Sequence, residues 1–536
     1  MDKRAFLAIA LSILILVVYQ EWVTRYYAPP PPTPEIAKEA PEKGPAATPA
    51  APAAPVQPKP IVVPQSRETK EIRVETDNYI ALFTNRGARL KSFTFKKYRS
   101  SVEANSPPFE IIEPASGIPL PLGIRWQNPT PFDDEELLYS VEGNDIKLTG
   151  DSKSMLVFSG RTETGTVVTK TFAFSGSTYP IALEVSVKAA DGRAPIPELI
   201  LTAKSDHSVK NPDAPFEGFI ALVDNKIKRE PHPDAGKTLE FVGEVSWAGF
   251  GYTYFFLGLL PENGAQHRIS LGHSGPALVA GITGPEGTSN LERYTLFIGP
   301  KELDILKSVG RGLERSIDFG YFGFISMPFL YVLHFFHSFT GSYGISIILL
   351  TVLLKLLMAP LTHKSFVSMK QMQKLQPQME RLKEKFKNDK EKLNKEVMEL
   401  YRRNGVNPLG GCLPMVLQFP VFIGLYNALS TPIELRHAEF LWIKDLSRPD
   451  WQSLPMTVGG WHFGIPVLTI LMGASMFIQQ WMTPSAGDPN QRKMMLMMPL
   501  IFTFMFVSFP AGLTVYWLVN NILTIGQQYW INRMEK

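Results

Sequence analysis

The chain has 536 residues, a formal net charge of +4, 45% hydrophobic and 19% charged residues, and one cysteine. Its length predicts more than one domain, and its apolar residues gather toward the two ends, which is typical of a membrane protein. So small a net charge gives no reason to expect a nucleic-acid partner, and a single cysteine excludes intrachain disulfides.

Residues 1–28 are predicted to form an amino-terminal transmembrane anchor. Lys3 and Arg4 precede an apolar run, and Trp22 and nearby tyrosines follow it as an interfacial belt. A secretory signal peptide is the alternative, but Tyr-Gln-Glu-Trp stands where a small-residue cleavage site would lie. We therefore expect an uncleaved anchor with a cytoplasmic amino terminus. It leads into a Pro/Ala-rich linker at residues 29–65, which contains 13 prolines and cannot bury a core.

Residues 66–300 are predicted to form a large periplasmic all-β sandwich. Short segments such as 181–187 alternate apolar and polar residues, with Gly, Asn, Asp and Pro between them. The segment has no phosphate-binding loop, nucleophile elbow or zinc-protease motif. The acidic run 133–136 lacks calcium-loop spacing, and the histidines lack metal-ligand spacing. We expect no metal, no cofactor and no enzymatic activity.

Residues 301–341 are predicted to contain amphipathic or interfacial helices. One helix is expected over residues 302–318, where leucines and isoleucines recur on one face. The apolar segment 321–339 is long enough to span a bilayer, but a span there would place the following basic loop outside. We therefore expect it to lie flat in the outer interface.

Residues 342–362 are predicted to form transmembrane helix 2, with Lys355 as the one ionisable group. Thr351 lies four residues earlier and therefore on the same helical face. Lys355 could snorkel to the cytoplasmic interface, because it lies close to the end of the segment. The alternative is a charged, hydrated cavity within the membrane, since a lysine in such a run usually faces protein or water.

Residues 363–411 are predicted to form a cytoplasmic basic helical hairpin, with 12 Lys or Arg against six Asp or Glu. It could be an ordinary solvated helix pair, or a landing site for an anionic partner. Further transmembrane helices are expected at 412–429, 464–482, 494–509 and 513–530, with a periplasmic loop at 430–463 and a cytoplasmic tail at 531–536.

Four motifs in the carboxy-terminal half carry a resemblance to a known family. They are residues 407–414 (NPLGGCLP), 418–420 (QFP), 441–446 (LWIKDL) and 509–513 (FPAGL). Together with the order of the segments, they resemble the YidC/Oxa/Alb family of membrane protein insertases, in its Gram-negative YidC form. The anchor, the linker and the β domain fit that form more loosely.

The resemblance implies five core transmembrane helices around a hydrophilic groove that is open to the cytoplasm and to lipid. It places Lys355, Thr351, Gln418, Tyr516 and Trp517 at groove-lining or substrate-contacting positions. Lys355 stands where the family usually has arginine, so the charge is kept and the bidentate fork is lost.

The expected function is the insertion and folding of nascent membrane proteins in the bacterial inner membrane. The expected partners are nascent membrane proteins, the lipid bilayer, the Sec translocon, and the ribosome and signal recognition particle receptor through the basic hairpin. A secondary transporter with Lys355 as counter-ion is the alternative, and it would show internal repeats. A membrane-tethered β-domain enzyme is a second alternative, although one anchor would suffice for tethering.

Overall fold

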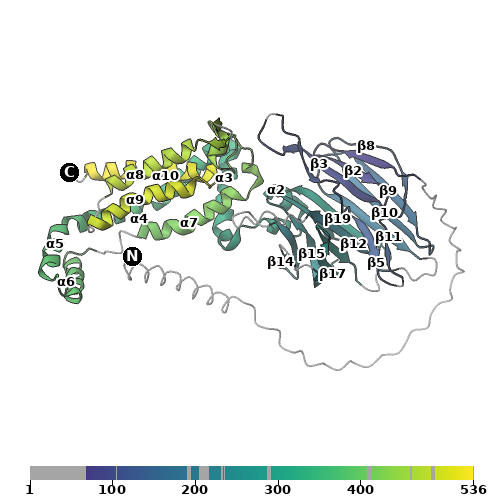
Figure 1. The fold of residues 1–536 in the computed structure, drawn as a ribbon, viewed down its shortest axis with the longest axis horizontal. Helices are drawn as coiled ribbons and strands as arrows, with labels where there is room; N and C mark the ends of the chain where they lie inside the picture. The colour runs from purple at the N-terminus through teal and green to yellow at the C-terminus, as the bar shows by residue number, and fades with distance from the viewer. Residues whose placement is uncertain are drawn as a thin grey trace, which may run out of the picture. The chain divides into compact units, whose positions relative to one another are not determined.

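The computed structural model describes residues 68–534, apart from 104, 129, 190–194, 205–216, 231–232, 234–235, 263, 286–290, 407–412, 459–460 and 484–488 (Figure 1). The predicted anchor and linker lie outside these described residues. An all-β domain comes first along the chain, and an α-helical domain follows it.

The β domain contains nineteen strands within the described residues. Their bounds are β1 Glu71–Glu75, β2 Tyr79–Thr84, β3 Arg89–Arg99, β4 Pro108–Ile112, β5 Gly123–Trp126, β6 Phe132–Asp133, β7 Ser140–Glu142, β8 Ile146–Lys147, β9 Lys153–Arg161, β10 Val167–Ser175, β11 Ile181–Lys188, β12 Glu198–Lys204, β13 Gly218–Val223, β14 Lys226–Glu230, β15 Leu239–Gly251, β16 Phe255–Pro261, β17 Gln266–Ser274, β18 Ala277–Thr283 and β19 Leu291–Pro300.

The strands form a five-stranded sheet, β4-β3-β2-β1-β8, and a larger sheet, β6-β5-β12-β18-β17-β15-β16-β19-β11-β10-β9-β7. Strand β15 joins the two halves of the larger sheet. Its first half pairs with β17, whereas its second half pairs with β13 and β16. The larger sheet therefore changes neighbours along one long strand.

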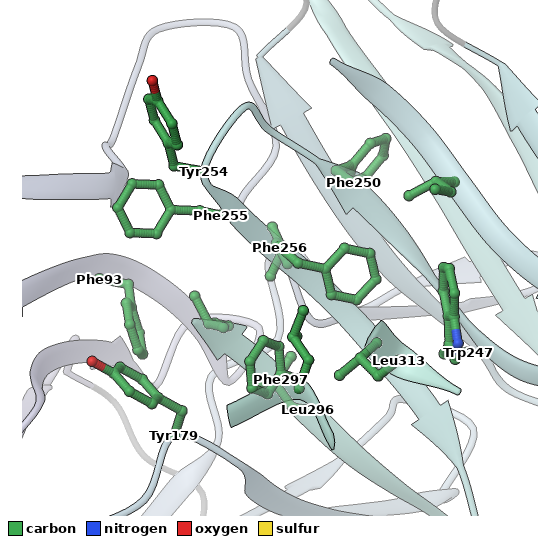
Figure 2. Close-up of a cluster of buried hydrophobic side chains, with 14 of the residues drawn as sticks. Phe93, Tyr179, Trp247, Phe250, Tyr254, Phe255, Phe256, Leu296, Phe297 and Leu313 are labelled. Atoms are coloured by element: carbon green, nitrogen blue, oxygen red, sulfur yellow. The ribbon is translucent and has the colours of Figure 1, made fainter. Parts of the chain in front are cut away.

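The core lies where the five-stranded sheet packs on the second half of the larger sheet. Phe83 of β2 contacts Phe172 and Phe174 of β10, with ring centroids 4.9 and 5.8 Å apart. Phe95 of β3 stacks on Phe255 of β16 at 4.7 Å. Figure 2 shows another part of the same hydrophobic core, around Phe93, Phe255 and Phe256. Inward residues alternate with half-exposed ones along β10, as the period-two pattern predicts.

The segment after β19 packs back onto the β domain. The prediction of a single helix over residues 302–318 is wrong. Helix α2 (Leu303–Val309) ends early, and a short 3-10 turn, η1 (Leu313–Ser316), follows it. Gly310, Arg311 and Gly312 all have positive φ angles, 79°, 55° and 71°, which an α-helix cannot contain. The reversal places Leu313 in the hydrophobic cluster of Figure 2, and Trp247 donates a hydrogen bond to the Gly312 carbonyl.

The helical domain contains the helices α3 Gly323–Thr340, α4 Tyr343–Lys374, α5 Gln376–Lys385, α6 Lys390–Arg403, α7 Leu413–Ser430, α8 Val467–Met482, α9 Pro489–Phe506 and α10 Ala511–Met534 (Figure 1). A 3-10 turn, η2 (Gly320–Phe322), precedes α3. The expected end of transmembrane helix 2 at residue 362 is not a helix end, since α4 continues to Lys374. After Leu375 the chain enters α5, which begins at Gln376 and carries Pro377 in its first turn, where proline is tolerated.

Small residues allow two of these helix pairs to approach closely. A side chain added at Gly424 of α7 would lie 2.7 Å from Ile325 of α3, and one at Gly473 of α8 would lie 2.1 Å from Thr503 of α9. Such contacts are typical of helices packed in a membrane, where packing replaces the hydrophobic effect as the main driving force. In the described chain, α4 is the helix long and apolar enough to cross a bilayer, and α8 and part of α9 are shorter apolar helices.

The segment between α7 and α8 contains two 3-10 turns, η4 (Ile433–Leu435) and η5 (Asp450–Ser453). A two-stranded hairpin follows, β20 (Pro455–Val458) and β21 (Trp461–Gly464). The sequence patterns did not predict this hairpin. Asp450 is buried, and its carboxylate accepts hydrogen bonds from the Leu468 amide and the Thr469 hydroxyl at the start of α8. Asp450 therefore caps α8 although it lies 18 residues before Leu468 in the sequence.

Candidate functional site in the helical domain

Lys355 lies half-buried on α4 and faces α10. Its Nζ donates a hydrogen bond of 2.6 Å to Oγ1 of Thr524, and that hydroxyl donates in turn to the carbonyl of Asn520. The Thr524 hydroxyl can accept because its one hydrogen is used within its own helix. The ammonium group of Lys355 is therefore held toward α10.

Among the residues that the structure describes, Lys355 has no acidic partner. The sequence segments that form α4, α7, α8, α9 and α10 contain no Asp or Glu. Within the described residues, the one hydrogen bond of the Lys355 ammonium is to the Thr524 hydroxyl. A partly buried cation without a counter-ion attracts anionic groups more strongly than a solvated one, because the local dielectric is low.

The contact with Thr524 belongs to a polar stripe along α10. Gln527 donates a hydrogen bond of 3.0 Å to the hydroxyl of Thr362 on α4. On the adjacent face, the amide of Asn521 donates to Ser475 of α8 at 2.9 Å, and that of Gln528 donates to Thr483 after α8 at 3.0 Å. Helix α10 is therefore hydrogen-bonded to α4 through one face and to α8 through the next.

Gln418, Tyr516 and Trp517 form a second group nearer the start of α10. The amide of Gln418 on α7 hydrogen-bonds the hydroxyl of Tyr516, whose side chain is buried. Trp517 packs against Phe422 of α7 and Phe506 of α9, with ring centroids 5.3 and 5.1 Å apart. Tyr516 and Thr524 are eight residues apart, so about 12 Å of helix rise separates the two groups.

Thr351 does not line an open surface in this structure. Its side chain is 1% exposed, and its hydroxyl donates to the carbonyl of Ile347 one turn earlier. It shares a helical face with Lys355, as predicted, but no hydrogen bond joins the two side chains. Its position is that of a residue packed inside the bundle.

A small cavity lies where the carboxy-terminal parts of α4, α8 and α10 meet. Its volume is about 10 Å³, and it is lined by Phe366, Lys370, Met482, Gln528, Ile531 and Asn532. This space is close to the minimum that holds one water molecule. The carbonyl oxygen of the Gln528 side chain is buried and has no partner within the described part of the protein. A water molecule there would satisfy that oxygen.

Thr524 was missed at the sequence level, although it is the direct partner of Lys355. Asn520, Asn521 and Gln527 stand out in the sequence as polar residues of a span. Thr524 shares their helical face, at i+3 or i+4 from Asn520 and Asn521, and this spacing was the available signal. A lone threonine in an apolar helix is otherwise unremarkable because its hydroxyl can bond its own helix.

The basic segment after α4 consists of α5 and α6. Asp389 caps α6 by accepting a hydrogen bond of 3.1 Å from the Lys392 amide. The hydroxyl of Tyr401 on α6 lies 3.1 Å from the sulfur of Met379 on α5, so the two helices face each other. Most of their charged side chains are exposed.

The described chain therefore defines a class of protein: an all-β domain joined to an α-helical domain, in which one helix is long and apolar enough to cross a membrane and carries a lysine within its apolar run. Residues 71–332 match the family model described as YidC periplasmic domain, and residues 335–536 match that described as 60Kd inner membrane protein. The chain belongs to the YidC family, and both the predicted family and the predicted fold class are confirmed.

Curated relatives match along the whole chain. The membrane protein insertase YidC of Pelobacter propionicus is 41% identical over 564 residues, which cover 100% of this chain and 99% of that protein. The membrane protein insertase YidC of Syntrophus aciditrophicus is 39% identical over 562 residues, which cover 99% of this chain and 100% of that protein. A solved structure of an active YidC insertase with its first transmembrane domain resolved is 18% identical, with a TM-score of 0.39, covering 88% of this chain and 95% of that one.

Proposed function

We propose that this protein inserts and folds nascent membrane proteins in the bacterial inner membrane, with its β domain in the periplasm. The observation that carries the proposal is the position of Lys355, a cation within a membrane helix whose neighbours supply a hydroxyl and no carboxylate. Relatives that cover the whole chain and are named membrane protein insertases support the same function.

The proposed site is a hydrated, positively charged groove beside α10, open to the cytoplasm and to lipid. Lys355 attracts acidic residues in the hydrophilic end of a nascent helical segment. An opposite charge at 4 Å gains about 4 kcal/mol at an effective dielectric constant near 20. Thr524 keeps the ammonium oriented, and Gln418 and Trp517 contact the substrate nearer the periplasmic side. Tyr516 is buried and acts by holding Gln418 through its hydroxyl.

Release into lipid follows from apolar burial. The apolar part of the substrate leaves the groove sideways, and its transfer into hydrocarbon is favourable by about 25 cal/mol per Å². The groove shortens the distance that polar residues travel through the apolar layer, so the reaction needs no covalent chemistry and no cofactor. Thr351 then acts in the packing of the bundle rather than in substrate contact.

The topology we propose places both termini in the cytoplasm. The basic helices α5 and α6 face the cytoplasm, because short loops rich in Lys and Arg stay there. Their exposed charges suit the ribosome or the signal recognition particle receptor, and the membrane helices suit the Sec translocon. Helix α3 lies in the outer interface. A transporter is not favoured, because the spans show no pair of matching halves.

The test is the insertion of a short single-span substrate with an acidic translocated tail into proteoliposomes. Lys355→Ala is expected to lower the insertion rate about tenfold, which corresponds to about 1.4 kcal/mol. Lys355→Arg is expected to keep it, because the charge is retained. A substrate with a neutral tail is the control and should be less affected. Full activity of the alanine variant on the acidic substrate would contradict the proposal.

A further inference from the structure

A cleft of about 600 Å³ lies on one face of the β domain, far along the chain from the membrane site. Its floor is the part of the larger sheet formed by β5, β12, β18, β17 and the first half of β15. The volume is within the range of sites for small molecules. The aromatic residues described above as the core of the β domain do not line this cleft.

One row of side chains crosses the cleft from strand to strand. Neighbours in the register of the sheet are, in order, Arg125, Glu198, Thr283, Arg268 and Val242. A second row lies beside it and includes Ser270 and Glu240. Because alternate residues of a strand point to opposite faces, these side chains lie on the same face of the sheet.

Glu198 is fixed at the centre of the floor. Its Oε2 accepts a hydrogen bond of 2.5 Å from Nε of Arg125, and its Oε1 accepts one from the hydroxyl of Ser270. A glycine makes room for this carboxylate, because a Cβ atom at Gly281 would lie 1.9 Å from Oε1. Each carboxylate oxygen can accept a further hydrogen bond, and the outer nitrogens of Arg125 can still donate.

The charges that line the cleft balance, with Arg125 and Arg268 against Glu198 and Glu240. This balance disfavours a strongly anionic ligand, and the described residues contain no group of His, Cys, Asp or Glu suited to a metal ion. Arg268 and Glu240 are exposed at the rim, together with the amides of Gln127, Asn128 and Gln266. The cleft therefore presents alternating donors and acceptors to a neutral, polar ligand.

The sheet face also disfavours an extended peptide. Strands β5, β12, β18 and β17 are each paired on both sides, so their main-chain groups are already used. A peptide that binds by strand addition needs a free edge instead. A ligand in this cleft has to be recognised by side chains. The fixed pair of Arg125 and Glu198 can accept from and donate to two adjacent hydroxyl groups, while the exposed Val242 and Ile196 can cover an apolar C–H face.

We propose that this cleft binds a neutral saccharide through adjacent hydroxyl groups. The pair of Arg125 and Glu198 forms the floor of the site, and Arg268 and Glu240 form its rim. The binding is independent of the insertion reaction, because no residue of the membrane site takes part. It gives the β domain a ligand of its own on the periplasmic side.

The experiment uses the full-length protein in nanodiscs and ligand-observed saturation-transfer NMR. The probes are maltotriose, tri-N-acetylchitotriose and isomaltotriose, which are all neutral, with an unstructured peptide of mixed charge as a fourth probe. At least one saccharide is expected to bind, and Arg268→Ala and Glu240→Ala should each weaken it about tenfold by removing a charged hydrogen-bond partner. Both side chains are exposed, so these variants should fold.

The matched control is Glu184→Ala, which removes an exposed ion pair with Arg293 on strands outside the cleft. Binding in this control should equal that of the unaltered protein. The proposal is overturned if no saccharide binds at millimolar concentration, or if binding persists in both rim variants. It is also overturned if no saccharide binds, whereas the peptide binds and the rim variants abolish its binding. None of these readouts depends on insertion activity.

Discussion

Two lysines in this protein, one fully buried and one half-buried, show how differently one residue type can be used. Lys170 of the β domain is fully buried, and its Nζ lies 2.7 Å from a carboxylate oxygen of Asp134 and from the carbonyls of Gly87 and Leu122. Such a satisfied network stabilises a fold without offering a site. The ammonium group of Lys355 has a single hydrogen bond within the described residues, to the hydroxyl of Thr524, in place of such a network. Its charge is left for a ligand to neutralise, which is why we assign function to Lys355 and structure to Lys170.

A third lysine gives a prediction of pH dependence. Burial lowers the pKa of Lys301, at the end of the β domain, from its ordinary value of 10.5 to about 8. Folding therefore disfavours the charged form. The contribution of Lys301 to the free energy of unfolding is most unfavourable below pH 8, and this penalty is lost as the pH increases from about 8 toward 10.5. Lys301→Met should raise the free energy of unfolding at pH 7 by up to about 3 kcal/mol.

Pulse proteolysis in urea at pH 7 and pH 9.5 measures this effect. The stabilisation by Lys301→Met should be smaller at the higher pH, where the unaltered lysine is largely neutral in the folded protein. Lys188→Met is the control, since Lys188 is exposed at the end of a strand. Equal stabilisation at both pH values, or a loss of stability at pH 7, would refute the explanation.

Among the secondary-structure elements, α8 depends on a distant cap. Pro466 precedes the helix without capping it through a side chain, and Asp450 supplies both hydrogen bonds instead. Asp450→Ala should lower the stability of the protein by about 1–2 kcal/mol, in the range of a lost cap. Asp450→Asn should cost less, because the amide keeps one acceptor oxygen. Thermal unfolding of the purified protein measures both effects. Equal unfolding midpoints for Asp450→Ala and the unaltered protein would argue against this cap.

Several elements could be predicted from the sequence because their signals are local. Helices form where apolar runs predict them, and β11 forms where the period-two alternation of residues 181–187 predicts a strand. The interruption at Gly310–Gly312 was missed, since an amphipathic pattern does not reveal three consecutive positive φ angles. The continuation of α4 to Lys374 was missed because the pattern records where apolar character ends, whereas the helix itself continues into the more polar sequence that follows.

The candidate site was only half predictable. Lys355 is visible as a charge in an apolar run, and Gln418 and Tyr516 came from a resemblance and prove to be hydrogen-bonded. The bond from Lys355 to Thr524 joins residues 169 positions apart. No periodicity within one helix can show which face of a second helix it meets, so such pairs require the tertiary structure.

At the scale of the whole molecule, the two domains carry different chemistry. The β domain is held by a large aromatic core and presents a cleft with balanced charges. In the helical domain, Lys355 lies in the apolar part of α4, and side-chain hydrogen bonds join α4 to α10 and α10 to α8. Membership of the YidC family is consistent with this division, and we place the insertion reaction in the helical domain.

The central claim is that water reaches position 355 from the cytoplasm, and cysteine labelling tests it directly. Cys412 is the one natural cysteine, so Lys355→Cys in a Cys412→Ser background carries a single thiol. We expect a membrane-impermeant maleimide applied to inverted vesicles to label that thiol. Exposed Lys387→Cys is the positive control, and Leu357→Cys, at an exposed position within the apolar run of α4, is the negative control. A thiol at position 355 that stays as unreactive as the one at position 357 would contradict the account.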